Sequence, residues 1–339
     1  MLERFVKQTK YASQEDFIKN FKVEVPENFN FGYNVVDAWA AEQPDKKAIL
    51  WTNDQGLEHQ YTYAELKEKT DATAAYFQSL GIGKGDMAML IPIASWQEVR
   101  KELQSVKKNI FLLAEAEGEE FFDDAFDACY GWELHHAMVD VAQGKSRVWA
   151  LRDKVYSLLN NYPQTSMHLS FTSNHDENSW SGTEFSRMGL AHEAMSLFTF
   201  VAPRSLPLIY TGQEIGYDHV FQFFDRDPIR KYAPNHHTER YRKLIRLYHE
   251  NRALWANEGE WVEIRNNAED CLMILVRETA DNRVIAVMNL SPYTIQAEYN
   301  TGIYAGRYTD FMAEKPYALP TSVSEIMAPW AYRVLTLQK

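Results

Sequence analysis

Three acidic side chains follow short apolar runs of this sequence, at points where buried strands are expected to end. Glu115 closes FLLAE, Asp176 closes FTSNHD, and Glu214 follows LIYTGQ. Two neighbouring carboxyl groups, one protonated and one ionised, are what the cleavage of a glycosidic bond requires. His175, beside Asp176, could hydrogen-bond a sugar hydroxyl. If the fold brings these residues together, their types predict acid–base chemistry on a carbohydrate.

The same residues also have a purely structural interpretation. An Asp after a strand often serves as a helix N-cap or a turn former, and a single His is often a structural hydrogen-bonding group. Glu117, Glu119 and Glu120 are typical of a solvated acidic turn. The spacing alone leaves both interpretations open.

The alternation of predicted strands and helices supplies the scaffold. From about residue 86, short apolar segments that end in polar residues alternate with amphipathic helices. This pattern predicts a parallel sheet with crossover helices, and favours a barrel whose chemistry gathers at the carboxyl ends of its strands. After about residue 259, hairpin-forming segments such as CLMILVRE and RVIAVMNLS predict a small antiparallel sandwich. Residues 1–85 are typical of a mixed α/β segment.

Composition narrows the class of partner. The 339 residues carry a net charge of −12, which disfavours nucleic acid and anionic membranes. No long uncharged apolar stretch could span a bilayer, the N-terminus MLERFVKQTK lacks the apolar core of a signal peptide, and Cys129 and Cys271 fit no metal spacing. We therefore expect a cytoplasmic, reduced protein. The sequence predicts no oligomeric state.

Several segments from about residue 86 to 339 resemble the second half of glycoside hydrolase family 13, the α-amylase family. FLLAE is similar to the fifth-strand segment, which would make Glu115 the acid/base. FTSNHDE is similar to the seventh-strand segment, where Asn174, His175 and Asp176 would hold the sugar. LPLIYTGQEIG is similar to the eighth-strand segment and would add Glu214 to the sugar-binding residues.

The same resemblance implies a nucleophilic Asp on the fourth strand, preceded two residues earlier by an Arg. The segment DMAMLIPIASW resembles the stretch of Asp, apolar residues, Pro and helix-opening Trp, so the nucleophile role falls on Asp86. Lys84 stands where the family has Arg. This is a departure, because an ammonium is a point charge whereas a guanidinium is a planar fork that orients a carboxylate.

The first part of the chain resembles a different family. FNFGYNVVDAWAAEQPDKKAILW and QYTYAELKEKTDATAAYFQSLGIGKGDMAML are similar to the opening of an acyl-CoA synthetase, an adenylate-forming enzyme, although the phosphate loop is absent. The chain thus looks chimeric. We expect an acyl-CoA synthetase-like fragment over 1–85, a partial (β/α)8 barrel with strands 4/5 to 8 over 86–258, and a C-terminal antiparallel β-sandwich over 259–339.

The resemblance implies an α-amylase-type glycoside hydrolase that performs retaining cleavage or transfer at α-glucosidic bonds, with an α-glucan or maltooligosaccharide as partner. Because the first strands of the barrel are missing, we expect weak or no turnover, and it stays open whether the chain is an enzyme. The alternatives are a fragment of an AMP-forming ligase and a non-catalytic sugar-binding protein.

No cofactor or transition metal is expected from the sequence. The resemblance allows calcium, but no ligand set for it is identified. The neighbouring residues His135 and His136 are expected to be structural, and His236 and His237 to lie in a solvated turn before Thr238, a predicted N-cap.

Overall fold

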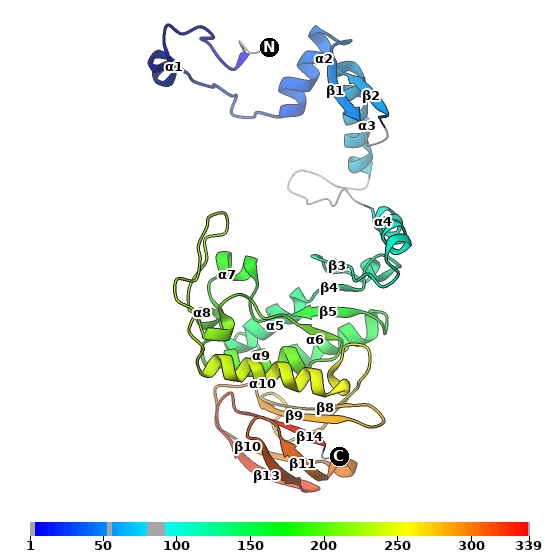
Figure 1. Ribbon diagram of the computed structural model, residues 1–339, viewed down its shortest axis with the longest axis vertical. Coiled ribbons are helices and arrows are strands. Elements are labelled where there is room, and N and C mark those ends of the chain that lie inside the picture. Colours follow the sequence, from blue (N-terminus) through cyan, green and yellow to red (C-terminus); the bar gives the residue numbers. More distant parts are fainter. Residues whose placement is uncertain (1–3, 53–55, 80–91, 338–339) are drawn as a thin grey trace. The chain divides into compact units, whose positions relative to one another are not determined.

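The computed structural model describes residues 4–52, 56–79 and 92–337. The chain divides into two compact units, Met1–Leu90 and Ile91–Lys339 (Figure 1). Asp86 and Lys84, the expected nucleophile and its neighbour, lie outside the described residues. Within the described ranges, no helix combines the length and the apolar character needed to cross a bilayer.

The first unit has little core of its own. A two-stranded antiparallel sheet, β1 with β2, is followed by a long helix, α3. Among its described residues, the buried apolar side chains are Val6, Val36 and Ala38, while aromatic rings such as Phe31 and Tyr33 are exposed. The hydrophobic stabilisation of this unit is therefore small. Its elements are α1 (Gln14–Asn20), the π-helix η2 (Gly32–Asp37), α2 (Ala38–Glu42), β1 (Lys47–Thr52), β2 (Glu58–Thr62) and α3 (Tyr63–Ser79).

A parallel sheet organises the first part of the second unit. Its described strands lie in the order β3-β4-β5-β6 and pair in parallel. Helices connect β4 to β5 and β5 to β6. This confirms the predicted α/β class with crossover helices and fits a partial barrel. The elements are α4 (Ile93–Val106), β3 (Leu113–Ala114), η3 (Glu119–Phe122), β4 (Ala128–Tyr130), α5 (Trp132–Ala142), α6 (Val148–Asn161), β5 (Met167–Ser170), α7 (His175–Ser181), α8 (Glu184–Met188), η4 (Gly189–Ala191), α9 (His192–Val201), β6 (Ser205–Pro207), η5 (Gln213–Ile215), α10 (His236–Glu250) and η6 (Arg252–Leu254).

Two antiparallel sheets form the C-terminal part, as predicted from its hairpin pattern. One has six strands in the order β12-β11-β14-β9-β8-β7, and the other pairs β10 with β13. The strands are β7 (Glu260–Glu263), β8 (Leu272–Glu278), β9 (Arg283–Asn289), β10 (Ile295–Asn300), β11 (Gly306–Asp310), β12 (Lys315–Leu319), β13 (Ser322–Met327) and β14 (Tyr332–Leu337), with the short helix η7 (Gly302–Tyr304) after β10.

The central strands β8 and β9 of the six-stranded sheet are buried on both faces. Along β8, Met273 and Leu275 pack in one core with side chains of α5, α6, α9 and α10, whereas Leu272, Ile274 and Val276 pack in a second core with β10 and β13. Successive side chains of a strand point to opposite faces, so a continuous apolar run is what a doubly covered strand requires. Figure 1 shows α9 and α10 between the parallel sheet and β8–β9.

The start of α10 differs from the sequence prediction. Asn235, not Thr238, is the N-cap: its side chain accepts the backbone N–H of His237 at 2.9 Å. Thr238 is the third helical residue, and its hydroxyl accepts the backbone N–H of Asn235 at 3.1 Å. Asn is among the best N-cap residues, and the reciprocal capping box accounts for the earlier start.

Candidate active site

The parallel sheet brings the predicted acids to one edge. Glu115 comes directly after β3, and His175 and Asp176 come shortly after β5, where they open α7. Strands β3 and β5 both pair in parallel with β4, so their carboxyl ends lie on the same side of the sheet. Topology alone therefore places Glu115 on the same edge as His175 and Asp176.

The three side chains form one cluster. His175 Nε2 lies 3.3 Å from Glu115 Oε1 and 3.8 Å from Asp176 Oδ2. One ligand-type atom from each residue lies within 4.8 Å of the other two. The side chains of Glu115, His175 and Asp176 are 54%, 44% and 37% exposed. The cluster is thus assembled but open to water.

Tyr130, at the end of β4, lies near this cluster. The residue is buried and packs its ring against Trp132 and Phe171. Burial raises the pKa of Tyr130, and the negative charges of Glu115 and Asp176 raise it further. The phenol therefore stays neutral and adds no charge beside the two carboxylates.

A buried ion-pair network holds the 171–177 loop. Arg187 on α8 lies 3.2 Å from Glu177 (Nη1–Oε2) and donates to the carbonyl oxygen of Thr172 at 3.0 Å. His135 on α5 lies 3.3 Å from Glu177 (Nε2–Oε2). The His135 hydrogen bond is the largest influence on the pKa of Glu177, which is held below its usual range despite burial. These contacts fix the loop that carries the candidate site.

Asn174 is the N-cap of α7, so Asp176 is not. The Asn174 side chain accepts the backbone N–H of Glu177 at 2.8 Å and is 1% exposed, which leaves Asp176 free of a capping role. Within the described ranges, Asn174 Nδ2 has no hydrogen-bond partner. Asn174 therefore has a structural role as a helix cap. Among the described residues, its side chain makes no hydrogen bond to the open cluster.

Glu214 is not part of the cluster. Its Oε2 accepts the backbone N–H of Gly212 at 2.9 Å, and its carbonyl oxygen accepts the Thr238 hydroxyl at 2.7 Å. The first contact closes the turn at the start of η5, and the second ties η5 to the start of α10. Of the predicted sugar-binding residues, the structure thus brings His175 to the acids, but not Glu214.

An aromatic surface, which no sequence pattern indicated, adjoins His175. The ring of Phe223 stacks on His175 with centroids 5.9 Å apart, and it contacts Trp180 and Phe224 at 5.3 Å and 4.8 Å. Trp180 is 65% exposed and Phe224 is 85% exposed. Phe223 and Phe224 lie in the loop before α10, and only the fold brings that loop beside α7. These rings offer an exposed apolar platform next to the acids.

Glu117 differs from the solvated turn expected for residues 117–120. Its carboxylate accepts the backbone N–H of Glu133, near the start of α5, at 2.9 Å. Burial raises the pKa of Glu117 to about 7, against the lowering effect of that hydrogen bond. Glu117 lines a small, partly open pocket with Lys154, Tyr162 and other side chains. It is therefore a second acid near β3 that is partly protonated at neutral pH.

Two side-chain groups in the described residues have the composition of a metal site. One is Glu115, His175 and Asp176, and the other is Glu193 with His236 and His237. The first group needs no ion to explain it, since the imidazole already lies between two carboxylates.

Comparison with known proteins separates two resemblances. No family model matches the chain. It is 37% identical over 71 residues to acetyl-coenzyme A synthetase of Coprinopsis cinerea. This match covers 21% of this chain and 11% of that protein. It is 26% identical over 233 residues to maltogenic α-amylase of Bacillus acidopullulyticus. This match covers 62% of this chain and 37% of that protein. The chain thus spans between about a tenth and somewhat over a third of these relatives.

Solved structures share its architecture. A noncanonic maltogenic α-amylase, AmyB of Thermotoga neapolitana, matches with a TM-score of 0.65 at 17% identity, over 89% of this chain and 74% of that one. A variant of AmyP in complex with maltotriose matches with a TM-score of 0.58 at 15% identity, over 84% and 72%. The parallel sheet with its helices and the C-terminal sheets therefore have an α-amylase family fold, in a chain of which about a fifth is similar to acyl-CoA synthetases.

Proposed function

We propose that this protein binds α-glucan chains at the Glu115–His175–Asp176 cluster, as an α-amylase-type glycoside hydrolase with weak or no turnover. The observation that carries the proposal is the convergence of these three side chains at the carboxyl ends of β3 and β5, within 4.8 Å of one another. Ligands and catalysis gather at this end of the strands in barrels of this class.

The chemistry expected of each group follows from its position. Glu115 would protonate the leaving oxygen, and Asp176 with His175 would hydrogen-bond the distorted sugar ring. The nucleophile would be Asp86, which lies outside the described residues. A retaining reaction needs the acid and the nucleophile about 5–5.5 Å apart. Lys84 would orient that nucleophile less firmly than the Arg of the family.

Two features support binding more strongly than turnover. A general acid is usually kept protonated by an apolar pocket, whereas the Glu115 side chain is 54% exposed. The aromatic surface of Trp180, Phe223 and Phe224 needs no such pocket, because the apolar face of a sugar can stack directly on a ring. Maltotriose, bound to one of the structural neighbours, is therefore a suitable probe.

Calorimetric titration with maltotriose and maltoheptaose tests the proposal. We expect saturable binding that weakens about tenfold in Glu115→Gln and Asp176→Asn, because each loses a charge-assisted hydrogen bond, and that also weakens in Trp180→Ala. Glu119→Gln, an exposed acid of the following turn, should bind as the natural chain does. Equal affinity in all variants would refute the site.

The acyl-CoA synthetase resemblance supports a second candidate, an adenylate-forming activity. ATP–pyrophosphate exchange would reveal it. We expect none, because the sequence lacks the phosphate-binding loop, and because a fifth of the chain covers only 11% of the acetyl-coenzyme A synthetase that it matches. Exchange above the background of a heat-denatured sample would show that this expectation is wrong.

A further inference from the structure

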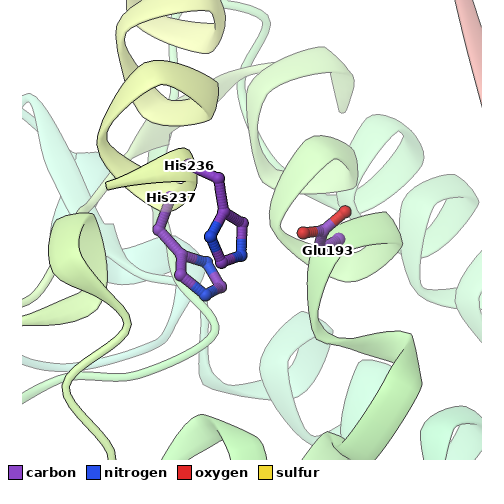
Figure 2. A group of neighbouring side chains, drawn as sticks. All are labelled: Glu193, His236 and His237. Carbon is purple, nitrogen blue, oxygen red and sulfur yellow. The ribbon is translucent and has the colours of Figure 1, made fainter. Parts of the chain in front are cut away.

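Two helix starts bring a second group of ligand-type side chains together. Glu193 is the second residue of α9, and His236 and His237 are the first two residues of α10. One ligand atom from each lies within 4.8 Å of the other two. Figure 2 shows both imidazole rings directed into the space between the helices, with the Glu193 carboxylate facing them.

The pairing of the two imidazoles is specific to this helix start. Consecutive residues of a helix point about 100° apart, so they rarely serve together as ligands. His236 and His237 nevertheless have ring centroids 4.0 Å apart. His135 and His136, also consecutive and also near a helix start, lie 5.7 Å apart and form no such group with other described residues. Sequence adjacency alone therefore does not create the cluster.

Packing holds the ring of His237 in place. A Cβ on Gly216 would lie 2.6 Å from His237 Nε2, so the ring packs directly against that glycine. Phe185 lies on another side, with ring centroids 5.9 Å apart. In the part of the chain that the structure describes, neither His236 nor His237 makes a side-chain hydrogen bond. One half-buried imidazole and one exposed imidazole thus have nitrogen atoms available to coordinate an ion.

The ligand types of the group select the kind of ion. Arg240 Nε lies 3.6 Å from Glu193 Oε2, and the N-termini of α9 and α10 carry partial positive charge. These charges oppose the binding of any cation, so they do not choose between metals. Calcium and magnesium depend on several oxygen ligands, which two imidazoles do not supply. Zinc binds well to two imidazoles and one carboxylate.

We propose that Glu193, His236 and His237 bind one zinc ion, with water in the fourth position. Ligand bonds of about 2.0–2.2 Å place neighbouring ligand atoms roughly 3.4 Å apart in a tetrahedral site, so side-chain movements of the order of 1 Å complete it. The ion cross-links the starts of α9 and α10, which share the larger hydrophobic core. It therefore stabilises the second unit and takes no part in sugar chemistry.

Zinc binding to the chelator-treated full-length chain tests this site. We expect calorimetric titration with zinc chloride to show a tight event that weakens at least about tenfold in His236→Gln and in Glu193→Gln. Zinc should raise the melting temperature of the natural chain but not of these variants. Two variants on different helices separate loss of a ligand from damage to one helix. Without zinc, His236→Gln should melt at the temperature of the natural chain because that side chain is exposed, whereas Glu193→Gln also loses its ion pair with Arg240.

His175→Gln is the matched control, because it removes the imidazole of the other metal-like group. It should retain both the tight zinc binding and the melting shift. Calcium should leave the melting temperature of the natural chain unchanged. The proposal is wrong if His236→Gln binds zinc as tightly as the natural chain, if His175→Gln abolishes the tight event, or if calcium stabilises the chain as much as zinc does.

Discussion

Glu117 allows a quantitative test of the packing beside β3. Its side chain is half-buried, and its pKa is raised from 4.5 to about 7, chiefly by burial. Glu117→Gln keeps the shape of the side chain and an oxygen that can accept the backbone N–H of Glu133, which lies 2.9 Å away. The substitution therefore removes the ionisation and little else.

The sign of the effect follows from proton binding. Between pH 4.5 and about 7, the folded state holds a proton on Glu117 that the unfolded state has released, so stability falls as the pH rises. The destabilisation is absent below pH 4.5 and complete above pH 7. At about 1.4 kcal/mol per pKa unit it reaches at most about 3 kcal/mol. Because the side chain is only half-buried, solvent screening reduces this to about 1–2 kcal/mol.

Thermal unfolding of the natural chain and of Glu117→Gln at pH 5, 6, 7 and 8 measures this effect. The melting temperature of the variant should rise relative to the natural chain by about 2–8 °C between pH 5 and pH 8. Other groups of the same region also titrate, including His168, whose pKa burial lowers to about 4. The difference between the two chains at each pH cancels their contribution. Glu119→Gln, in the exposed part of the turn, is the control. A difference that does not depend on pH, or the same dependence in the control, would refute the burial argument.

Two further substitutions probe contacts that hold the second unit together. Arg277→Met should lower the free energy of unfolding by about 3 kcal/mol or more. The reason is that the buried guanidinium donates to the carbonyl oxygens of Ala202 at 2.7 Å and Gly259 at 3.2 Å. An unchanged midpoint of urea unfolding would contradict this prediction. Asp127→Asn should cost about 1–2 kcal/mol, because it breaks the 2.7 Å pair with Arg100 of α4, and should speed hydrogen exchange in that helix. Unaltered exchange would mean that the pair does not hold α4.

The strand ends were predictable because their signal is local. Apolar runs that end in polar residues mark buried parallel strands, and parallel strands align their carboxyl ends. The sequence pattern therefore sufficed to expect Glu115, His175 and Asp176 at one edge of a sheet. The choice of Asn174 as N-cap also follows from local chemistry, although the pattern left Asp176 open for that role.

The remaining features depend on contacts between distant segments. Glu193 meets His236 only because α9 and α10 begin side by side, and nothing in the spacing of either segment indicates it. Phe223 reaches His175 because the loop before α10 folds back over α7. The burial of Glu117 depends on α5, whose start donates to the carboxylate. The sequence pattern predicts elements and their order, whereas these side-chain meetings require the packed structure.

The proposed function depends on Glu115, His175 and Asp176 forming one sugar-binding site. A maltotriose titration followed through the imidazole proton resonances of the full-length chain tests this, with His175 assigned by its loss in His175→Gln. We predict a saturable shift of the His175 resonance, while the resonance of His237, at the start of α10, stays unchanged. An unmoved His175 resonance at saturating sugar, or equal small shifts of all histidines, would show that sugar does not bind at this cluster.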